Sequence, residues 1–587
     1  MSIRRLRNIG VILVSALVSV ATLAQSHGGG GGRPAQPTTS RVDPTMPSTL
    51  PPSAVSYRSA ESEGKLEFRT QTILVQVPVV VTDKNGNHIH GLTKDDFRVS
   101  ESGKEQKISA FEEMIATTGK FPAVPLKPGQ FGNLTLSEQQ PRTVTVIALD
   151  TVNTPFLDQA YGRRELVKYL ARSLDSGQVL ALMLITSHGL KVVQRLTGDP
   201  EQLLQILKKA SGELPAMQGI DMDAQADAAT GDIPDIPAPS SDPDAAMQAF
   251  VERGDAIYSQ FQQQNAIETT MNAFLGIAWS LSGVPGRKSL IWATGGFPFT
   301  ILSPDAVPNG YLSTLYERTM EALSESQISV YPVDIRGLVS SSPVGEASRS
   351  SKPTTRQINN RAWLQQSSID SLDEFADMTG GKAFYNTNDL ASSFKRAADD
   401  ASSYYLLGYY LDTHNNHAGW RQLKVKVDKK DTEVRARKGF FVTNATVHAE
   451  LTRNSDMSYA LSSPIEGTGV PVTVEWVSVG GEGEKKKAVF LARMPPNGLV
   501  IDPATQNNLN FDFAAVAWSD KDGKEASRAA LNFTKTLPEE QLAAIRASGV
   551  HFTNALQLGP GKYTVRFVVR DNVTGKVGSV TAPLTVD

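Results

Sequence analysis

The chain has 587 residues and a formal net charge of −3, from 58 Lys and Arg against 61 Asp and Glu, and it contains no cysteine. At ~100 to 200 residues per domain this length predicts about three to five domains, and a hydrophobic content of 40% is ample for packed cores. The balanced charge gives no indication of nucleic-acid binding, and the lack of cysteine excludes disulfide frameworks, thiolate catalysis and thiolate-bound zinc or iron–sulfur centres.

The N-terminus has the pattern of a secretory signal peptide over residues 1–24. Arg4, Arg5 and Arg7 precede an uncharged apolar run over residues 9–23. A single membrane anchor is the alternative, but the run is shorter than the ~20 residues that span a bilayer. Cleavage removes three arginines and changes the net charge from −3 to −6. We therefore expect a soluble, secreted or periplasmic mature chain with no stable membrane span.

The next segments predict a tether and a small β module. Residues 25–66 are rich in Gly, Pro, Ser and Thr, which is typical of a flexible linker. Residues 67–115 contain β-branched runs separated by turn residues and predict an N-terminal β module. This module is marginal alone, so we expect strands from elsewhere in the chain to complete it. A second linker is expected over residues 116–141.

Residues 142–402 change to a pattern of short, continuous apolar runs alternating with helical periodicity. The runs lie at residues 143–149, 179–186, 289–293 and 328–333. This alternation predicts an α/β domain with a doubly wound, Rossmann-like sheet. Residues 190–196 follow the second run after only three residues, so they predict an antiparallel edge strand. Two insertions are expected as loops, an acidic one at residues 213–244 and a Ser/Pro-rich one at residues 340–355.

The C-terminal part of the chain returns to strand patterns. Residues 403–445 are expected to complete the N-terminal β module, and residues 466–587 predict a separate β-sandwich of Ig-like type. The predicted fold class is therefore α/β, a doubly wound sheet flanked by β-sandwich modules.

Ligands of a doubly wound sheet meet the carboxyl ends of its strands, so the residues that follow each run are the candidate site. These are Asp150, Thr151, Asn153 and Thr154 after the run at residues 143–149, and Ser187 after the run at residues 179–186. Thr294 and Gly295 follow the run at residues 289–293, and Asp334 and Arg336 follow the run at residues 328–333. From this set we expect a ligand face at Thr151, Ser187, Thr294, Gly295 and Arg336.

Several separated motifs resemble one family. The order of elements is similar to a von Willebrand factor type A (VWA) domain, and the strings ISVYPVDIRGL at residues 328–338 and SSYYLLGYY at residues 402–410 resemble its secreted, acidobacterial-type subfamily. The segments VVVTDKNGNHIHGLTKDDF at residues 79–97, TGGKAFY at residues 379–385 and VRARKGFF at residues 434–441 fit this subfamily too. The resemblance covers about residues 70–442.

The resemblance implies a metal-ion-dependent adhesion motif of the form DxSxS, which is degenerate here. Asp150 and Thr154 match its first and last positions, whereas Val152 replaces the middle serine and Gly295 stands where a later aspartate is expected. Asn153 and Asp334 supply further oxygens. A weak site for Mg²⁺, or for Mn²⁺ or Ca²⁺, is the resulting hypothesis, because Mg²⁺ needs near-octahedral oxygen ligation. The alternative is that Asp150 caps the following turn.

No catalytic set is assembled in the sequence, and no cofactor is certain. We therefore expect a secreted, non-enzymatic protein-binding, adhesion or envelope scaffold protein with a protein partner. A metal-assisted hydrolase that uses Asp150 and Asp334 is the alternative. An envelope structural protein without a specific ligand also stays open, since the sequence does not separate it from a binding protein.

Overall fold

The computed structural model describes residues 74–115, 126–133, 144–172, 179–199, 201–202, 204–206, 243–297, 310–338, 355–411, 419–442, 445–481, 483–496, 498–502 and 507–587. All of these residues belong to one compact unit of the chain. The predicted signal peptide and Gly/Pro/Ser linker lie outside the described residues. So do the loops predicted at residues 213–244 and 340–355, except for their last residues, 243–244 and 355, which begin helices. Among the residues that are described, no helix is long and apolar enough to cross a membrane.

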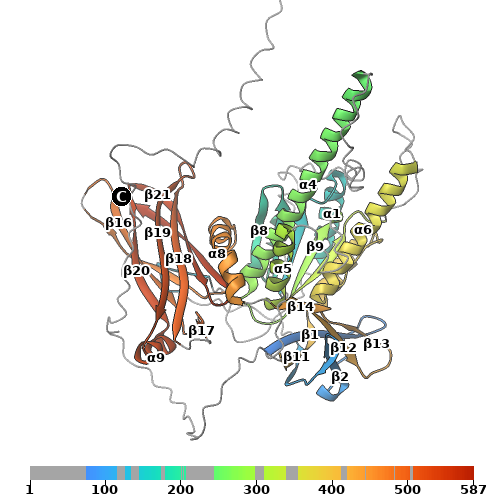
Figure 1. The fold of residues 1–587 in the computed structure, drawn as a ribbon, viewed down its shortest axis with the longest axis horizontal. Coiled ribbons are helices and arrows are strands. Elements are labelled where there is room, and N and C mark those ends of the chain that lie inside the picture. Colours follow the sequence, from blue (N-terminus) through green and yellow to red (C-terminus); the bar gives the residue numbers. More distant parts are fainter. Residues whose placement is uncertain are drawn as a thin grey trace, which may run out of the picture. The chain divides into compact units, whose positions relative to one another are not determined.

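Two four-stranded antiparallel sheets combine the start of the described chain with residues that lie more than 300 positions later (Figure 1). The first has the order β13-β1-β11-β4 and the second the order β14-β12-β2-β3. Their apolar faces share one core, with Val77, Val99 and Leu407 fully buried. The bounds are β1 Leu74–Asp83, the 3-10 helix η1 Lys94–Asp96, β2 Phe97–Glu101, β3 Lys104–Gln106, β4 Ala110–Ile115, β11 Ser403–Tyr410, β12 Gly419–Val427, β13 Thr432–Arg435 and β14 Gly439–Val442.

A five-stranded sheet of order β10-β9-β6-β7-β8 carries the candidate site. β10, β9, β6 and β7 pair in parallel, and β8 pairs antiparallel with β7. The four parallel strands are buried along their whole length, which explains their continuous apolar sequences. The bounds are β6 Val144–Asp150, β7 Val179–Thr186, β8 Gly189–Thr197, β9 Lys288–Thr294 and β10 Ile328–Asp334.

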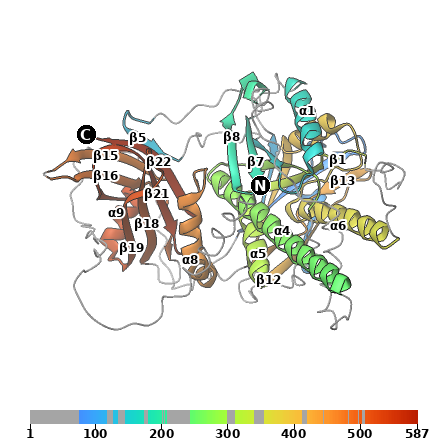
Figure 2. The same ribbon diagram turned by 90° about the horizontal axis from the view of Figure 1, so that it is seen from above.

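Helices pack against this sheet and form two separate hydrophobic cores with it. α4, α5 and α6 share one core with the sheet side chains around Trp292, and α1 and α7 share the other with those around Leu182. Figure 2 shows α1 beside β7 and β8, and α4 beside α5. The bounds are α1 Phe156–Arg172, α4 Pro243–Leu281, α5 Gly310–Glu325, α6 Thr355–Thr379 and α7 Leu390–Asp399.

The C-terminal part is a β-sandwich of two further antiparallel sheets. One has the order β20-β16-β15-β5 and the other the order β17-β18-β21-β22, with β19 paired to β18. Phe490, Phe513 and Phe567 pack together between the two sheets. The bounds are β5 Gln130–Gly132, α8 Ala445–Ser462, β15 Thr473–Gly480, β16 Lys486–Met494, β17 Ile501–Asp502, β18 Asn508–Ser519, β19 Glu525–Thr536, α9 Glu539–Ser548, β20 Val550–Leu558, β21 Gly561–Asp571 and β22 Val577–Val586.

The predicted fold class is wrong for this chain. The sequence predicts an α/β protein built on a doubly wound, Rossmann-like sheet and flanked by β-sandwich modules. Four of the five described sheets are small and antiparallel, so the architecture is mostly β and of β-sandwich type. The error arose because continuous apolar runs give a strong local signal, whereas half-exposed strands such as β19 give a weak one. Residues 130–132, placed in a linker, form strand β5 on the C-terminal sandwich.

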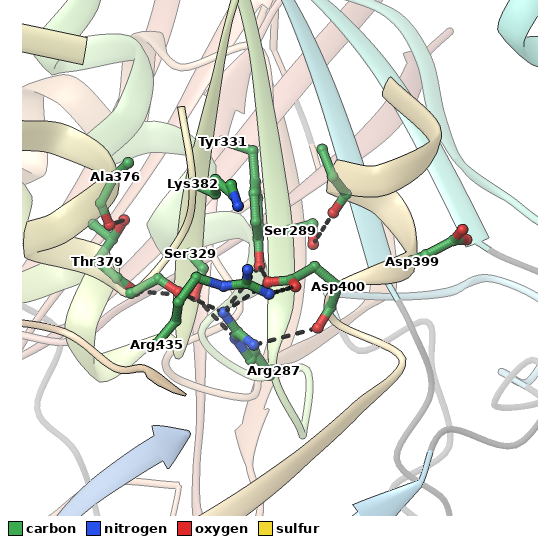
Figure 3. A network of polar contacts seen from close by, with 12 residues as sticks. Arg287, Ser289, Ser329, Tyr331, Ala376, Thr379, Lys382, Asp399, Asp400 and Arg435 are labelled. Atoms are coloured by element: carbon green, nitrogen blue, oxygen red, sulfur yellow. Dashed lines mark hydrogen bonds and ion pairs between the residues drawn. The ribbon is translucent and has the colours of Figure 1, made fainter. Parts of the chain in front are cut away.

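A buried polar network lies at the amino end of β9 and β10 (Figure 3). The guanidinium of Arg287 is almost completely buried and donates to Ser329 Oγ at 3.0 Å and to Tyr331 Oη at 2.9 Å. Tyr331 donates to Asp400 Oδ2 at 2.5 Å, and Arg435 of β13 forms an ion pair with Asp400 Oδ1. The network therefore ties β9 and β10 to the end of α7 and to an antiparallel sheet.

Candidate functional site

The carboxyl ends of β6, β9 and β10 form one edge of the five-stranded sheet. Thr294 lies opposite Asp334 in the pairing of β9 with β10, and its hydroxyl donates to Asp150 Oδ2 at 3.2 Å. The three residues thus follow one row across the sheet. Neighbouring strands are about 4.8 Å apart, so Asp150 and Asp334, two strands apart, are separated by about 10 Å between their Cα atoms.

The carboxylate of Asp150 accepts hydrogen bonds from five donors of this chain. Oδ1 accepts from the backbone N–H groups of Val152 and Asn153, both at 3.0 Å. Oδ2 accepts from Asn153 Nδ2 at 2.7 Å, from Trp292 Nε1 at 2.9 Å and from the Thr294 hydroxyl. Asp150 is 1% exposed, and burial raises the pKa of its carboxyl although the donors lower it. Asp150 therefore organises the loop that follows β6.

Four other predicted residues belong to the same cluster. The Thr154 hydroxyl donates to Asp150 O and accepts from Gly295 N at 2.9 Å. Asn153 Nδ2 also donates to Thr270 Oγ1 at 2.9 Å, which connects the loop to α4. A Cβ added to Gly295 would lie 2.8 Å from Pro155 Cδ, so the residue must be small for β9 to approach the loop. Thr151 donates to Ile185 O of β7 at 2.8 Å.

The remaining predicted residues lie apart from this cluster. Arg336 holds the carboxylate of Asp334 through two parallel bonds, from Nε to Oδ1 at 2.9 Å and from an Nη atom to Oδ2 at 2.7 Å. Such a bidentate pair is strong and specific in geometry. Ser187 is exposed in the β7–β8 turn, with its Oγ 3.3 Å from Nδ1 of His188. The expected ligand face is therefore divided among three places.

The four predicted metal ligands do not fit a divalent cation as they lie. A cation needs oxygen lone pairs directed at one point, but those of Asp150 and Asp334 receive N–H and O–H groups. Asn153 directs its amide nitrogen, not its oxygen, at Asp150. Within the described part of the chain, no group of three or more His, Asp or Glu side chains is placed to hold a metal ion.

An open pocket of about 310 Å³ lies beside this cluster, between α1, the ends of β6 and β7 and the start of β8. We call it the strand-end pocket. Its apolar walls include Leu149, Leu184 and Ile335, all part of the core under α1. Arg163 of α1 and Lys191 of β8 line it as cations. Its volume is at the lower end of the range typical of ligand sites.

Arg163 and Lys191 differ from Asp150 and Asp334 in having no charged partner within the described part of the chain. Arg163 Nε donates to the backbone oxygen of Gln159 at 3.3 Å, and burial lowers the pKa of the half-buried guanidinium. Among the residues that the structure describes, no carboxylate forms an ion pair with either cation. Asp150 borders the same pocket, but its oxygens are engaged as described above.

Sequence reasoning missed Trp292, Arg163 and Lys191. Trp292 stands inside the apolar run of β9, so its pattern indicates only a core residue, and a buried indole N–H that needs an acceptor is the one available signal. Arg163 and Lys191 are far apart in sequence and become neighbours only through the packing of α1 on the sheet. No local signal identifies that pair.

No family model and no curated protein matches the chain. Among solved structures, a mutant of the PilB minor pilin from Streptococcus sanguinis is 9% identical, with 56% of this chain and 87% of that chain covered and a TM-score of 0.22. The three N-terminal domains of the type V pili tip protein Mfa5 from Porphyromonas gingivalis are 8% identical, with coverages of 83% and 78% and a TM-score of 0.20. At these TM-scores the likeness supports no conclusion about fold or function.

Proposed function

We propose that the mature chain is a secreted or periplasmic, non-enzymatic protein that binds another protein at the strand-end pocket. One contrast carries this proposal. The two carboxylates of the edge are occupied by donors of this chain, while the two cations beside them have no carboxylate partner among the described residues. The edge therefore offers positive charge and apolar surface to a partner, while the carboxylates of Asp150 and Asp334 are already engaged.

The metal-assisted hydrolase is less well supported by the same contrast. A general base or a metal-bound water needs a carboxylate that can exchange its partners during the reaction. Asp150 is buried under five donors, and Asp334 is held by Arg336. The distance of about 10 Å between their Cα atoms, with Thr294 between them, also separates the two acids. A hydrolase would require both acids to leave these partners.

A capture experiment tests the proposal. The immobilised mature chain is exposed to an extract of the producing organism, and captured proteins are quantified at increasing load. We expect saturable capture that is lost in the double variant Arg163→Gln/Lys191→Gln and kept in Arg164→Gln. Arg164 is the matched control, because it is exposed on the same helix and lies outside the pocket.

Two results would contradict the proposal. Capture that is equal in the double variant and the control would show that the partner binds elsewhere. Hydrolysis of a compound from a broad substrate panel, abolished by Asp150→Ala in a chain that still folds, would establish an enzyme.

A further inference from the structure

The strand-end pocket combines two kinds of surface within a small volume. Leu149, Leu184 and Ile335 provide apolar walls, and Arg163 and Lys191 provide two positive charges that line the same cavity of about 310 Å³. A ligand that satisfies both must carry negative charge directly next to a compact apolar group. A purely apolar ligand would leave the half-buried Arg163 without a counter-charge, which is unfavourable.

We propose that the ligand is the C-terminal residue of a partner polypeptide, with an apolar side chain and a free α-carboxylate. This inference rests on the proposed binding function and names the group that is bound. The carboxylate would meet the guanidinium of Arg163, which matches carboxylate geometry in a planar, bidentate way. The apolar side chain would contact the walls formed by Leu149, Leu184 and Ile335.

The position of the charge distinguishes a chain terminus from an acidic side chain. In Asp and Glu only one or two methylene groups accompany the carboxylate, so these side chains cover little of the apolar wall. A terminal Leu or Phe carries the carboxylate on the same Cα atom as its apolar side chain. Capture of C-terminal carboxylates is an established mode of peptide recognition. A small organic acid with the same two groups shares this chemistry and is separated by the experiment.

The pocket is also built to resist collapse. Gln159 Nε2 donates to Thr154 O at 2.9 Å and to Thr151 O at 3.2 Å, which fixes the first turn of α1 to the loop after β6. Arg163 is one turn further along α1 and donates to Gln159 O. The cation therefore stands on an element that is attached to the Asp150 cluster, and its position is fixed before a ligand arrives.

The test measures binding of four probes to the full mature chain by calorimetry. Two probes are an octapeptide ending in leucine with a free carboxylate and the same peptide as its C-terminal amide. The other two are N-acetyl-leucine and N-acetyl-leucinamide. We expect the acid peptide to bind at least tenfold more tightly than its amide. Arg163→Gln should weaken the acid peptide at least tenfold, and Arg164→Gln should change its affinity less than twofold.

The outcomes separate this inference from the proposed function. Equal affinity of the acid and amide peptides, or unchanged affinity in Arg163→Gln with its unfolding temperature preserved, overturns the carboxylate assignment while protein capture can persist. Binding of N-acetyl-leucine without binding of the octapeptide overturns the polypeptide terminus in favour of a small organic acid. If the acid peptide binds tightly but Arg163→Gln captures protein as well as the unsubstituted chain does, the carboxylate site is supported and the proposed function is overturned.

Discussion

The assignment of Asp150 as a structural hydrogen-bond acceptor makes a quantitative prediction. Asp150→Asn keeps the shape of the side chain but turns an amide N–H₂ toward groups that also donate. Trp292 Nε1, which sits 2.9 Å from Asp150 Oδ2 in a fully buried ring, then loses its acceptor. Thr294 and Asn153 have second partners, Gly296 O and Thr270 Oγ1, so their loss is smaller.

The expected loss of stability follows from these contacts. A buried donor left without a partner costs about 1–3 kcal/mol, and more when the lost acceptor was charged. With one full orphan and two weakened donors, Asp150→Asn should lower the local free energy of opening by about 2–5 kcal/mol. Trp292→Phe removes the donor itself and should cost about 1–3 kcal/mol. The double variant should lose at least about 1 kcal/mol less than the sum, because both changes break the same bond.

Native-state hydrogen exchange with mass spectrometry is the suitable assay, because a chain with several modules does not unfold in one step. Peptides that cover β6 and β9 report the local opening, and peptides from β18 and β21 serve as an internal control. Additive losses within about 0.5 kcal/mol would refute the shared bond. A gain of stability in millimolar Mg²⁺, Mn²⁺ or Ca²⁺ that Asp150→Asn abolishes would instead establish the metal site, since a ligand at a hundredfold excess over its Kd stabilises by about 2.7 kcal/mol.

Three further predictions concern groups outside the pocket. Asp400→Ala should destabilise the chain by about 3–5 kcal/mol, because it leaves the buried Arg287 without its ion-pair partner. The neighbouring, partly exposed Asp399 is the control, and Asp399→Ala should cost less than about 1 kcal/mol in urea unfolding. Equal losses would contradict the role of the network in Figure 3. Burial lowers the pKa of Lys288 from 10.5 to about 7, so the native state resists its charge and stability should rise between pH 7 and 10.5. Lys288→Met should therefore stabilise the protein most below pH 7, by at most about 5 kcal/mol. If the stability gained by Lys288→Met in thermal unfolding does not decrease at alkaline pH, the buried charge of Lys288 is not its cause. Gly381→Ala should lower the melting temperature sharply, because the added Cβ would lie 1.9 Å from Val330 O. Gly254→Ala, in open space on α4, should instead stabilise the chain slightly, by up to about 1 kcal/mol. Similar effects at both sites would rule out the steric argument.

Single strands were predictable because burial on both faces leaves a strong local pattern. Residues 143–149 and 179–186 correspond to β6 and β7 within one residue, and residues 190–196 lie within the antiparallel strand β8. The fold class was not predictable from these strands. It depends on how many half-exposed strands pair elsewhere. The expectation that residues 403–445 complete the N-terminal β module rested on the small size of that module, and only the structure gives the pairing of β11 with β1 across more than 300 residues.

For the candidate site, too, some features could be predicted from the sequence and others could not. The row of Asp150, Thr294 and Asp334 followed from the rule that strand ends share one edge. The partners of these residues did not follow, since a donor such as Trp292 is hidden within an apolar run. The pair Asp334 and Arg336 is visible in the sequence as neighbours two positions apart, yet only the structure shows that they bind each other instead of a ligand.

The connection from Asp150 to the pocket permits one last prediction, which separates positioning from contact. Asp150 holds the loop at residues 151–154, Gln159 ties that loop to α1, and Arg163 stands one turn along the helix. Asp150→Asn should therefore weaken binding of the acid octapeptide as well as stability, although Asp150 offers the ligand no free lone pair. Arg163→Gln should weaken binding without loss of stability, because among the described residues its side chain donates only to a carbonyl of its own helix. Calorimetry and unfolding on the two variants give both quantities. If Asp150→Asn loses stability but keeps full affinity, the loop and the pocket are independent, and the rigidity argued for the Arg163 position does not arise from the Asp150 cluster.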